Sequence, residues 1–297
     1  MQIKNKSRTA DLMIFFSALL WGGEYVVVKD MLDYLPPNWI NAFRFITASL
    51  IMIPLFYRHI RSMSKEELRG GAILGTFMFG GFTLQTVGIQ YTTAAKSGFL
   101  TSTYVVMVPF IVWVFKQKFP GLKSLISAGV LIAGISFLSL DGTGKGLNRG
   151  DMLTLGAAIC FAGSIIGFDY YAKRHDPINL TFIEMLSGGL MSLVSASLTE
   201  AFPSPAGYGA YEIFQLLYLV LLGSLLCHVL SNVAMKWAEP THASILWSLE
   251  SVFALIFGLI FLHEDLTLRM GIGFILVFAA VLLTELGGKI RQKENSV

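Results

Sequence analysis

The chain has 297 residues, of which 54% are hydrophobic and only 14% are charged, and its mean hydropathy is +0.65. A soluble domain carries about a quarter charged residues, so this composition excludes an ordinary water-soluble globule. The net charge of +3 arises from 22 basic and 19 acidic residues without a basic cluster, so no nucleic-acid partner is expected. Cys160 and Cys227 lie inside apolar runs with no disulfide or metal-binding pattern, and we expect neither a metal nor a cofactor.

The first apolar segment, residues 11–30, follows Lys4, Lys6 and Arg8 as the apolar part of a signal peptide would. However, it is about as long as a membrane-crossing helix, contains Glu24, and has no small-residue cleavage site after it. We therefore expect it to be retained as the first span.

Nine further apolar segments follow, and the pattern predicts an all-α membrane protein with ten transmembrane helices. Pro109 interrupts the fourth segment, where the missing backbone N–H predicts a kink. The loops between the segments are short. The predicted spans are residues 11–30, 38–57, 69–90, 95–115, 123–140, 152–171, 179–199, 212–234, 242–262 and 268–288.

The lysines and arginines of the loops indicate the orientation. With a cytoplasmic N-terminus, 16 of the 22 basic residues lie on the cytoplasmic side, 5 lie on the far side, and Arg44 lies inside a span. Such a bias marks the cytoplasmic face. We expect a multi-pass protein of the bacterial inner membrane with both termini in the cytoplasm.

The ten segments divide into two sets of five, and a weak internal similarity relates the sets. Shifts of 140 or 146 residues align several positions of the two halves. Because five spans is an odd number, the halves have opposite orientations, as in transporters with inverted repeats. We expect two inverted five-helix repeats, residues 1–145 and 146–297. The aligned positions include 21–24 with 161–164, Arg44 with Glu184, Gln85 with Ser231 and Tyr104 with Glu250.

Several short motifs resemble the EamA branch of the drug/metabolite transporter superfamily, and the similarity covers nearly the whole chain. The motifs are Leu20-Trp21-Gly22 with Val28-Lys29, Arg44-Phe45 with Ala48, Ala243-Ser244-Ile245-Leu246, Ser251-Val252-Phe253-Ala254, and His263-Glu264-Asp265-Leu266-Thr267. The resemblance implies ten helices, a central cavity bordered mainly by helices 1, 3, 4, 6, 8 and 9, and commonly export of amino acids or other small metabolites. Glu250 stands where the family commonly has proline, and Glu24 where many members have a small or amide residue. Both departures point away from a generic neutral substrate.

Glu24 is the first candidate site residue. It lies beyond the midpoint of the first span, after Gly22 and Gly23, which let a neighbouring group approach closely. A carboxylate at this depth costs at least about 2.5 kcal/mol unless it faces protein or water. We expect Glu24 to bind substrate or to couple a proton, and the structural alternative is an ion pair with Arg44 or Lys96.

Glu250 is the second candidate, near the middle of the ninth segment. From the helical rise, Glu24 and Glu250 lie close to the membrane midplane on either side of it, so both carboxylates can face one cavity. Such an arrangement suits exchange of a proton or binding of a cationic substrate. Pairing of Glu250 with His242 or Lys236 is the structural alternative.

Five further polar or aromatic residues complete the predicted site. His228 and Asn232 are four residues apart and share one face of a helix. Gln85 aligns with Ser231 in the internal repeat, and Tyr104 and Trp247 are candidates for an aromatic wall. Interhelical hydrogen bonds and packing are the structural alternatives. Arg44 and Glu184 align with each other near the starts of their helices and are interpreted as structural charges.

These observations predict a secondary-active transporter that exports amino acids or similar small metabolites by alternating access, with protons as a candidate coupling ion. The alternative is an uptake carrier, or an uncoupled facilitator or channel, for a small organic cation. An enzyme is disfavoured, because the zinc-protease-like start His263-Glu264 is followed by Thr267 instead of the second histidine. The expected partners are a small-molecule substrate, protons and the lipid bilayer, and the chain acts as a monomer or a dimer.

Overall fold

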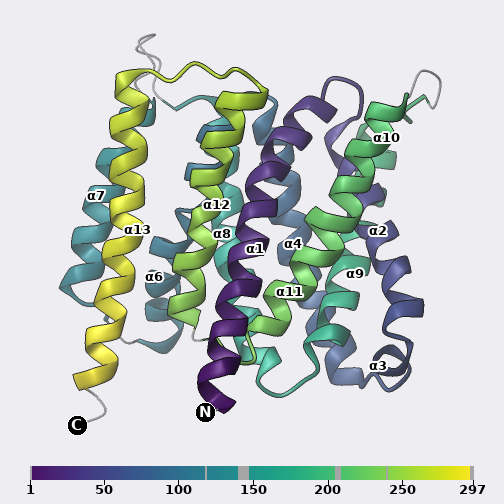
Figure 1. The fold of residues 1–297 in the computed structure, drawn as a ribbon, viewed down its shortest axis with the longest axis horizontal. Coiled ribbons are helices and arrows are strands. Elements are labelled where there is room, and N and C mark those ends of the chain that lie inside the picture. Colours follow the sequence, from purple (N-terminus) through teal and green to yellow (C-terminus); the bar gives the residue numbers. More distant parts are fainter. Residues whose placement is uncertain (1, 118, 140–146, 205–208, 239, 295–297) are drawn as a thin grey trace.

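The chain folds into a bundle of helices, and the described residues contain no β-strand (Figure 1). This computed structural model describes residues 2–117, 119–139, 147–204, 209–238 and 240–294. Helix α1 begins and α13 ends at the same end of the bundle, called here the terminal end, and the opposite end is called the distal end. The elements are α1 (Gln2–Met31), α2 (Pro37–Leu55), α3 (Tyr57–Arg61), α4 (Lys65–Ile89), α5 (Ala94–Thr101), α6 (Tyr104–Lys116), α7 (Leu122–Ser139), α8 (Arg149–Ala172), α9 (Pro177–Thr199), α10 (Ala210–Leu217), the π-helix η1 (Tyr218–Leu226), α11 (Cys227–Ala234), α12 (Pro240–Phe261) and α13 (Leu268–Glu294).

Several helices begin at residues that cap free backbone N–H groups. Ser64 and Glu67 form a capping box at the start of α4, and Asn148 and Asp151 form another at the start of α8. Such a cap contributes about 1 kcal/mol, because it satisfies N–H groups that have no partner within the helix. Proline occupies the first position of α2 and α9, where its missing N–H is not needed.

The fourth predicted span is interrupted, but not at Pro109. Helix α5 ends at Thr101, α6 begins at Tyr104, and Pro109 lies within α6. At the break, the hydroxyl groups of Ser102 and Thr103 donate to the carbonyls of Gly98 and Leu100, three or four residues earlier. Hydroxyl side chains compete in this way for the carbonyls of the preceding helical turn. The break therefore lies one to two turns before the position that the proline indicates.

The eighth predicted span is continuous but irregular, because the π-helix η1 lies between α10 and α11. A π-helical turn is wider than an α-helical one and is often found at functional sites. Here η1 contributes Gly223 and Ser224, whose contacts with α1 and α2 are described below.

Six stretches of the described chain have the length and composition to cross a membrane, and three further apolar helices are shorter. Large apolar side chains on their outer faces are exposed, as at Ile132 (66%) and Leu198 (80%). The all-helical prediction is thus confirmed for the described residues, whereas ten membrane spans stays a prediction. The six are Arg8–Met31, Lys65–Ile89, Ala94–Val114, Arg149–Ala172, Pro177–Thr199 and Ala210–Ala234; the shorter three are Leu122–Leu138, Leu246–Phe261 and Leu268–Leu283.

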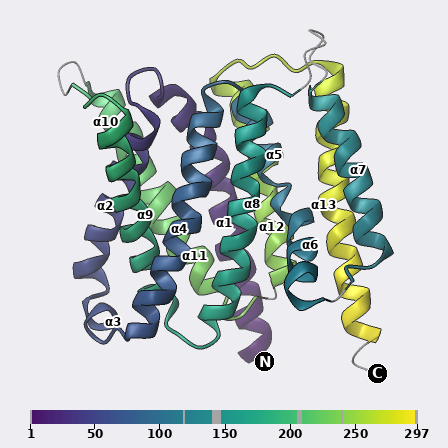
Figure 2. The same cartoon turned by 180° about the vertical axis from the view of Figure 1, so that it is seen from behind.

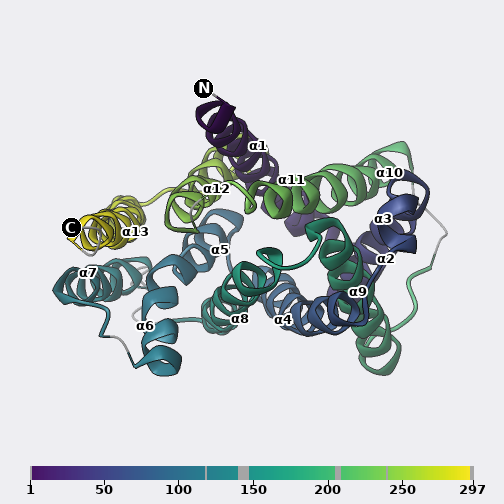
Figure 3. The same ribbon diagram turned by 90° about the horizontal axis from the view of Figure 1, so that it is seen from below.

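Helices of the two halves of the chain interleave. Helix α1 packs on α12, α2 on α9, α4 on α8 and α9, and α7 on α13 (Figures 2 and 3). Each of these pairs joins a helix of the first half to a helix of the second. The expected boundary between residues 145 and 146 lies outside the described residues.

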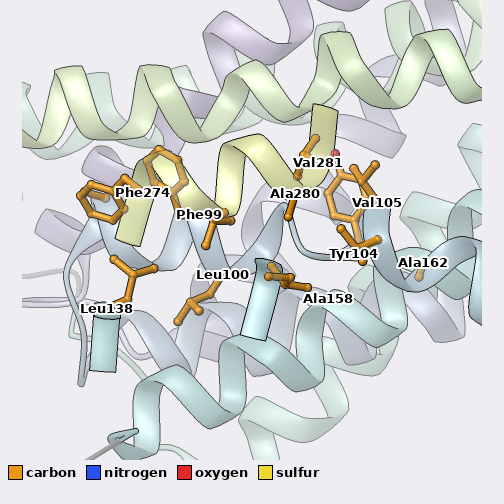
Figure 4. Packing of buried hydrophobic residues seen from close by; sticks show 14 residues of the cluster. Phe99, Leu100, Tyr104, Val105, Leu138, Ala158, Ala162, Phe274, Ala280 and Val281 are labelled. Carbon is orange, nitrogen blue, oxygen red and sulfur yellow. The ribbon is translucent and has the colours of Figure 1, made fainter. Parts of the chain in front are cut away.

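The largest buried apolar cluster lies where α5, α6 and α8 meet α7 and α13 (Figure 4). The rings of Phe99 and Phe274 stack with their centroids 4.3 Å apart, and Leu138 and Val281 are almost fully buried. The Ser127 hydroxyl donates a hydrogen bond to a backbone carbonyl of α13. This packing fixes α5 and α6 beside the central helices that carry the polar residues.

Candidate functional site

A cavity in the middle of the bundle is lined by both halves of the chain. It contains about 850 Å³ of space not occupied by protein atoms, part of which is open solvent. All seven predicted site residues line it, and so does Glu184. The seven are Glu24, Gln85, Tyr104, His228, Asn232, Trp247 and Glu250.

Glu24 forms a buried ion pair with Arg44, one of the two structural alternatives considered from the sequence. The distance between Arg44 Nη1 and Glu24 Oε1 is 2.5 Å, and Arg44 Nε donates to Ser224 Oγ at 2.9 Å. The guanidinium carbon of Arg44 also lies 4.5 and 4.9 Å from the ring centroids of Phe45 and Phe82. Glu24 Oε2 has no hydrogen-bond partner among the described residues. The negative charge of Glu24 is therefore balanced inside the protein.

Glycines allow α1 to lie close to its neighbours around Glu24. A Cβ atom placed on Gly23 would lie 2.5 Å from the hydroxyl oxygen of Tyr218, which itself donates to the Leu20 carbonyl at 2.8 Å. A Cβ atom on Gly223 would lie 2.8 Å from Glu24 Oε2. A side chain at either position would push α1 away from η1 and disturb the ion pair.

Glu250 lies in the same cavity and has no hydrogen-bond or ion-pair partner among the described residues. Glu250 is only 6% exposed, so its side chain is buried. It is one of the residues that line the cavity. Glu24 lines the same cavity. Lys236, a partner considered from the sequence, is exposed, and the side chain of His242 lies outside the described residues.

The remaining predicted residues are held by specific contacts. Gln85 Nε2 donates to Tyr25 Oη at 3.0 Å and to Thr101 Oγ1 at 3.1 Å. Trp247 Nε1 donates to Ser231 Oγ at 3.2 Å. These bonds fix the orientation of the amide and the indole in the cavity wall.

His228 lies among aromatic rings. Its ring centroid is 5.5 Å from that of Trp21 and 5.9 Å from those of Phe45 and Phe82. Its Nδ1 is 2.9 Å from the backbone carbonyl oxygen of Ser224. Because a carbonyl oxygen only accepts, Nδ1 carries a hydrogen, and Nε2 of the neutral ring is an acceptor.

Glu184, interpreted from the sequence as a structural charge, also faces the cavity. Asn232 Nδ2 donates to Glu184 Oε2 at 3.2 Å and to Thr181 Oγ1 at 2.8 Å, and Ser164 Oγ donates to Glu184 Oε1 at 3.3 Å. Arg44, by contrast, is fully buried behind the wall. Nothing in these contacts distinguishes a structural from a binding role for Glu184, so that assignment stays a prediction.

Most residues that sequence reasoning missed are apolar or aromatic. They include Trp21, Tyr25, Phe82, Phe161 and Phe168, all in the cavity wall. The internal similarity contained a usable signal, because a shift of 140 residues aligns positions 21, 24 and 25 with 161, 164 and 165, and all six line the cavity.

Polar contacts join the helices at the distal end of the bundle. Lys96 Nζ lies 2.7 Å from Asp151 Oδ2, and Lys29 Nζ donates to the carbonyls of Ile89 and Thr92 at 2.7 and 2.9 Å. Helix α8 begins at this end, and its lining residue Phe168 lies close to the other end of the helix. The cavity therefore extends from mid-depth toward the terminal end.

The described residues contain no group of three histidine, cysteine, aspartate or glutamate side chains placed to hold a metal ion.

Known proteins share this fold and sequence pattern. The model of the EamA-like transporter family matches residues 8–140 and 148–286. An "Uncharacterized transporter" of Archaeoglobus fulgidus is 34% identical over 93% of this chain and 86% of its own length. The "Uncharacterized transporter YvbV" of Bacillus subtilis is 25% identical over 97% of this chain and 94% of its own length.

A more distant relative and a solved structure are also similar to this chain. The "WAT1-related protein At3g02690, chloroplastic" of Arabidopsis thaliana is 25% identical over 89% of this chain and 66% of its own length. A crystal structure of another protein superposes with a TM-score of 0.69 at 14% identity, covering 93% of this chain and 96% of that one, which shows a shared fold. The chain belongs to the EamA-like transporter family and is a multi-pass membrane transporter.

Proposed function

We propose that the protein is a secondary-active carrier that exports amino acids or similar small metabolites by alternating access, with protons as the coupling ion. The observation that carries this proposal is a mid-bundle cavity whose wall contains buried carboxylates. A buried carboxylate can exchange a proton or pair with a substrate ammonium group, and the ion pair that joins helices at the distal end is the kind of contact that alternating access would make and break.

The two halves are proposed to be inverted five-helix repeats that together form ten membrane spans. A shift of 146 residues relates Gln85 and Thr101 to Ser231 and Trp247. Gln85 bonds Thr101 within one half, and Trp247 bonds Ser231 within the other. Equivalent bonds at related positions support a cavity built at the interface of two related units.

The proposed orientation places the terminal end in the bacterial cytoplasm and the distal end outside. Its support is the distribution of 16 basic residues against 5. Single cysteines at positions 62 and 34, in a background without Cys160 and Cys227, test it by labelling with a membrane-impermeant maleimide. We expect position 34 to react in intact cells and position 62 only after lysis, and the reverse pattern would overturn the orientation.

The carrier itself is tested by flux in proteoliposomes with an imposed pH gradient. We expect counterflow of a labelled solute that saturates and responds to the gradient. A second candidate, an uncoupled facilitator for a small organic cation, is favoured by the unpaired carboxylate of Glu250. It predicts cation flux that dissipates a concentration gradient and does not respond to ΔpH.

A further inference from the structure

The cavity wall offers hydrogen-bond acceptors to a ligand, while its nitrogen donors are already used. Every side-chain nitrogen of the described lining that carries hydrogens donates to a protein acceptor. An amide –NH₂ group has two hydrogens and an indole has one, so each donor is fully used. These residues are Trp21, Gln85, His228, Asn232 and Trp247.

The charges of the wall also favour a positively charged ligand. The described lining contains the carboxylates of Glu24, Glu184 and Glu250 but no lysine or arginine. The nearby guanidinium of Arg44 is buried behind the wall and bound to Glu24 and Ser224. A substrate carboxylate would therefore meet negative charge without a cation or a free N–H donor in the described lining, since Arg44, whose Nη2 has no hydrogen-bond partner, is not a lining residue.

Glu250 is the group best placed to bind a positive charge. Its residue is 94% buried, opens onto the cavity and has no partner among the described residues. A buried carboxylate in a membrane is costly unless it is paired, so a ligand cation would supply the missing partner. Glu184 differs, because each of its oxygens already accepts a hydrogen bond, from Ser164 or Asn232.

Aromatic rings surround these acceptors. An aromatic face attracts an ammonium or guanidinium group within about 6 Å of the ring centre, by about 0.5–2 kcal/mol. The same rings supply apolar contact for the rest of a small organic molecule. The aromatic lining residues are Trp21, Tyr25, Phe82, Tyr104, Phe161, Phe168 and Trp247.

We propose that the ligand of this cavity is an organic amine cation that lacks a carboxylate, and that Glu250 is its counter-ion. The inference rests on the proposed transport function and, within its class of amino acids and similar small metabolites, selects decarboxylated amines and similar cations over amino acids. It assigns Glu250 to cation recognition, and it leaves Glu24, paired with Arg44 behind the wall, in a structural role.

Matched probes test the chemistry by binding alone. Tyramine, tyrosine and 4-ethylphenol share one ring but differ in the amine and the carboxylate. Agmatine with arginine, and cadaverine with lysine, provide the same comparison without a ring. Calorimetric titration and thermal shift of the full chain in detergent measure binding without requiring flux. At least one amine is expected to bind about tenfold or more tightly than its parent amino acid, and 4-ethylphenol more weakly than tyramine.

The variant Glu250→Gln tests the assigned residue, because glutamine keeps the size and removes the charge. The amine that binds best to the native protein is expected to lose about tenfold to a hundredfold in affinity. The control Asp169→Asn removes an outer carboxylate that pairs with Lys173 at 2.7 Å, and is expected to leave affinity unchanged. Near-ultraviolet circular dichroism and gel filtration establish that each variant is folded.

The outcomes separate this inference from the proposed function. Amino acids that bind as tightly as their amines would overturn the inference while leaving a carrier in place, and so would an amine affinity unaffected by Glu250→Gln in a folded protein. Absence of binding by every amine would also overturn it. The proposed function fails separately, if reconstituted protein shows no saturable flux for any tested solute.

Discussion

The two halves of the cavity wall have corresponding positions but different charge. In the first half, Glu24 is balanced by Arg44 at 2.5 Å. At the positions related by 140 residues, the second half has Ser164 and Glu184, joined by a hydrogen bond of 3.3 Å. Glu250 adds a second carboxylate there, so the excess negative charge of the wall comes from the second half.

This difference separates a charge that maintains the structure from a charge that is available to a ligand. Removing one partner of a buried ion pair leaves an uncompensated charge and costs about 3–5 kcal/mol. Neutralising a buried carboxylate that has no partner removes a desolvation cost instead. Stability measurements on single variants therefore reveal which charges are balanced inside the protein.

The largest effect on stability is expected from breaking the Glu24–Arg44 ion pair of the first half. Arg44→Met leaves Glu24 without its cation, and we expect the free energy of unfolding to fall by about 3–5 kcal/mol. Reversible unfolding in mixed detergent micelles measures it.

The double variant Glu24→Leu/Arg44→Met is the matched control. It is expected to recover most of the loss, because replacing a whole buried pair by apolar residues of similar volume is often close to neutral. Equal stability of the single variant and the native protein would show that the pair is not structural.

A second ion pair lies at the distal end, outside the cavity. It allows the stability effect of a buried pair to be measured away from the proposed ligand site. Asp151 accepts hydrogen bonds from Lys96 Nζ at 2.7 Å and Thr92 Oγ1 at 2.9 Å. We expect Asp151→Asn to lose about 1.5–3 kcal/mol, since asparagine keeps the shape but loses the charge-assisted bond and one of the two acceptor oxygens, of which Oδ2 also serves the capping box of α8. Cysteine accessibility at the distal end should rise in the same variant, and unchanged labelling would argue against a role of this pair in closure.

Much of the fold was predictable from the apolar segments, because each segment had to be helical in a membrane. The seven candidate residues all line the cavity, and for the polar ones the reason is related: a polar side chain inside a span must face protein or water. Their role in binding stays a prediction. The ion pairs among these charged residues were not predictable from the sequence. Glu24 and Arg44 lie on different helices, and the sequence does not fix the relative rotation of those helices, so Lys96 was an equal candidate. The structure pairs Lys96 with Asp151.

The break in the fourth span shows a second limit. Pro109 removes one backbone hydrogen bond and marks an obvious weak point, yet α6 continues through it. The hydroxyl–carbonyl bonds at Ser102 and Thr103 depend on local side-chain rotamers. From residue type alone, Pro109 is the stronger signal for a helix break than Ser102 or Thr103. The break nevertheless occurs at Ser102 and Thr103.

A smaller change in stability, an increase, is expected when Glu250 of the second half is neutralised. Glu250→Gln removes a buried carboxylate that has no partner among the described residues, and we expect the free energy of unfolding to rise by up to about 1 kcal/mol in the absence of ligand. The same micelle unfolding assay applies. A loss of more than about 2 kcal/mol would indicate a structural partner for Glu250 and weaken its assignment to a ligand.

The smallest expected effect lies outside the membrane-spanning segments, at the terminal end. Asp176 Oδ2 lies 2.6 Å from His59 Nδ1, and Asp176 Oδ1 accepts from the backbone N–H of Ile178 at 2.9 Å. Partial burial disfavours the charged carboxylate, but the hydrogen bonds from His59 and Ile178 outweigh it and hold the pKa of Asp176 below its usual range.

A lowered pKa in the folded state means that this carboxylate stabilises the fold above the unfolded value of about 3.9, and that the contribution is lost as the pH falls through the folded value. Because the pair is partly exposed, Asp176→Asn should cost no more than about 1 kcal/mol at pH 7, and less in high salt. Asparagine still caps α9, so the variant isolates the charge from the cap. The difference in free energy of unfolding between native and variant protein should shrink as the pH falls below about 4. A difference that instead grows below about pH 4 would mean that Asp176 is destabilised by its surroundings, and that the two contacts do not outweigh its burial.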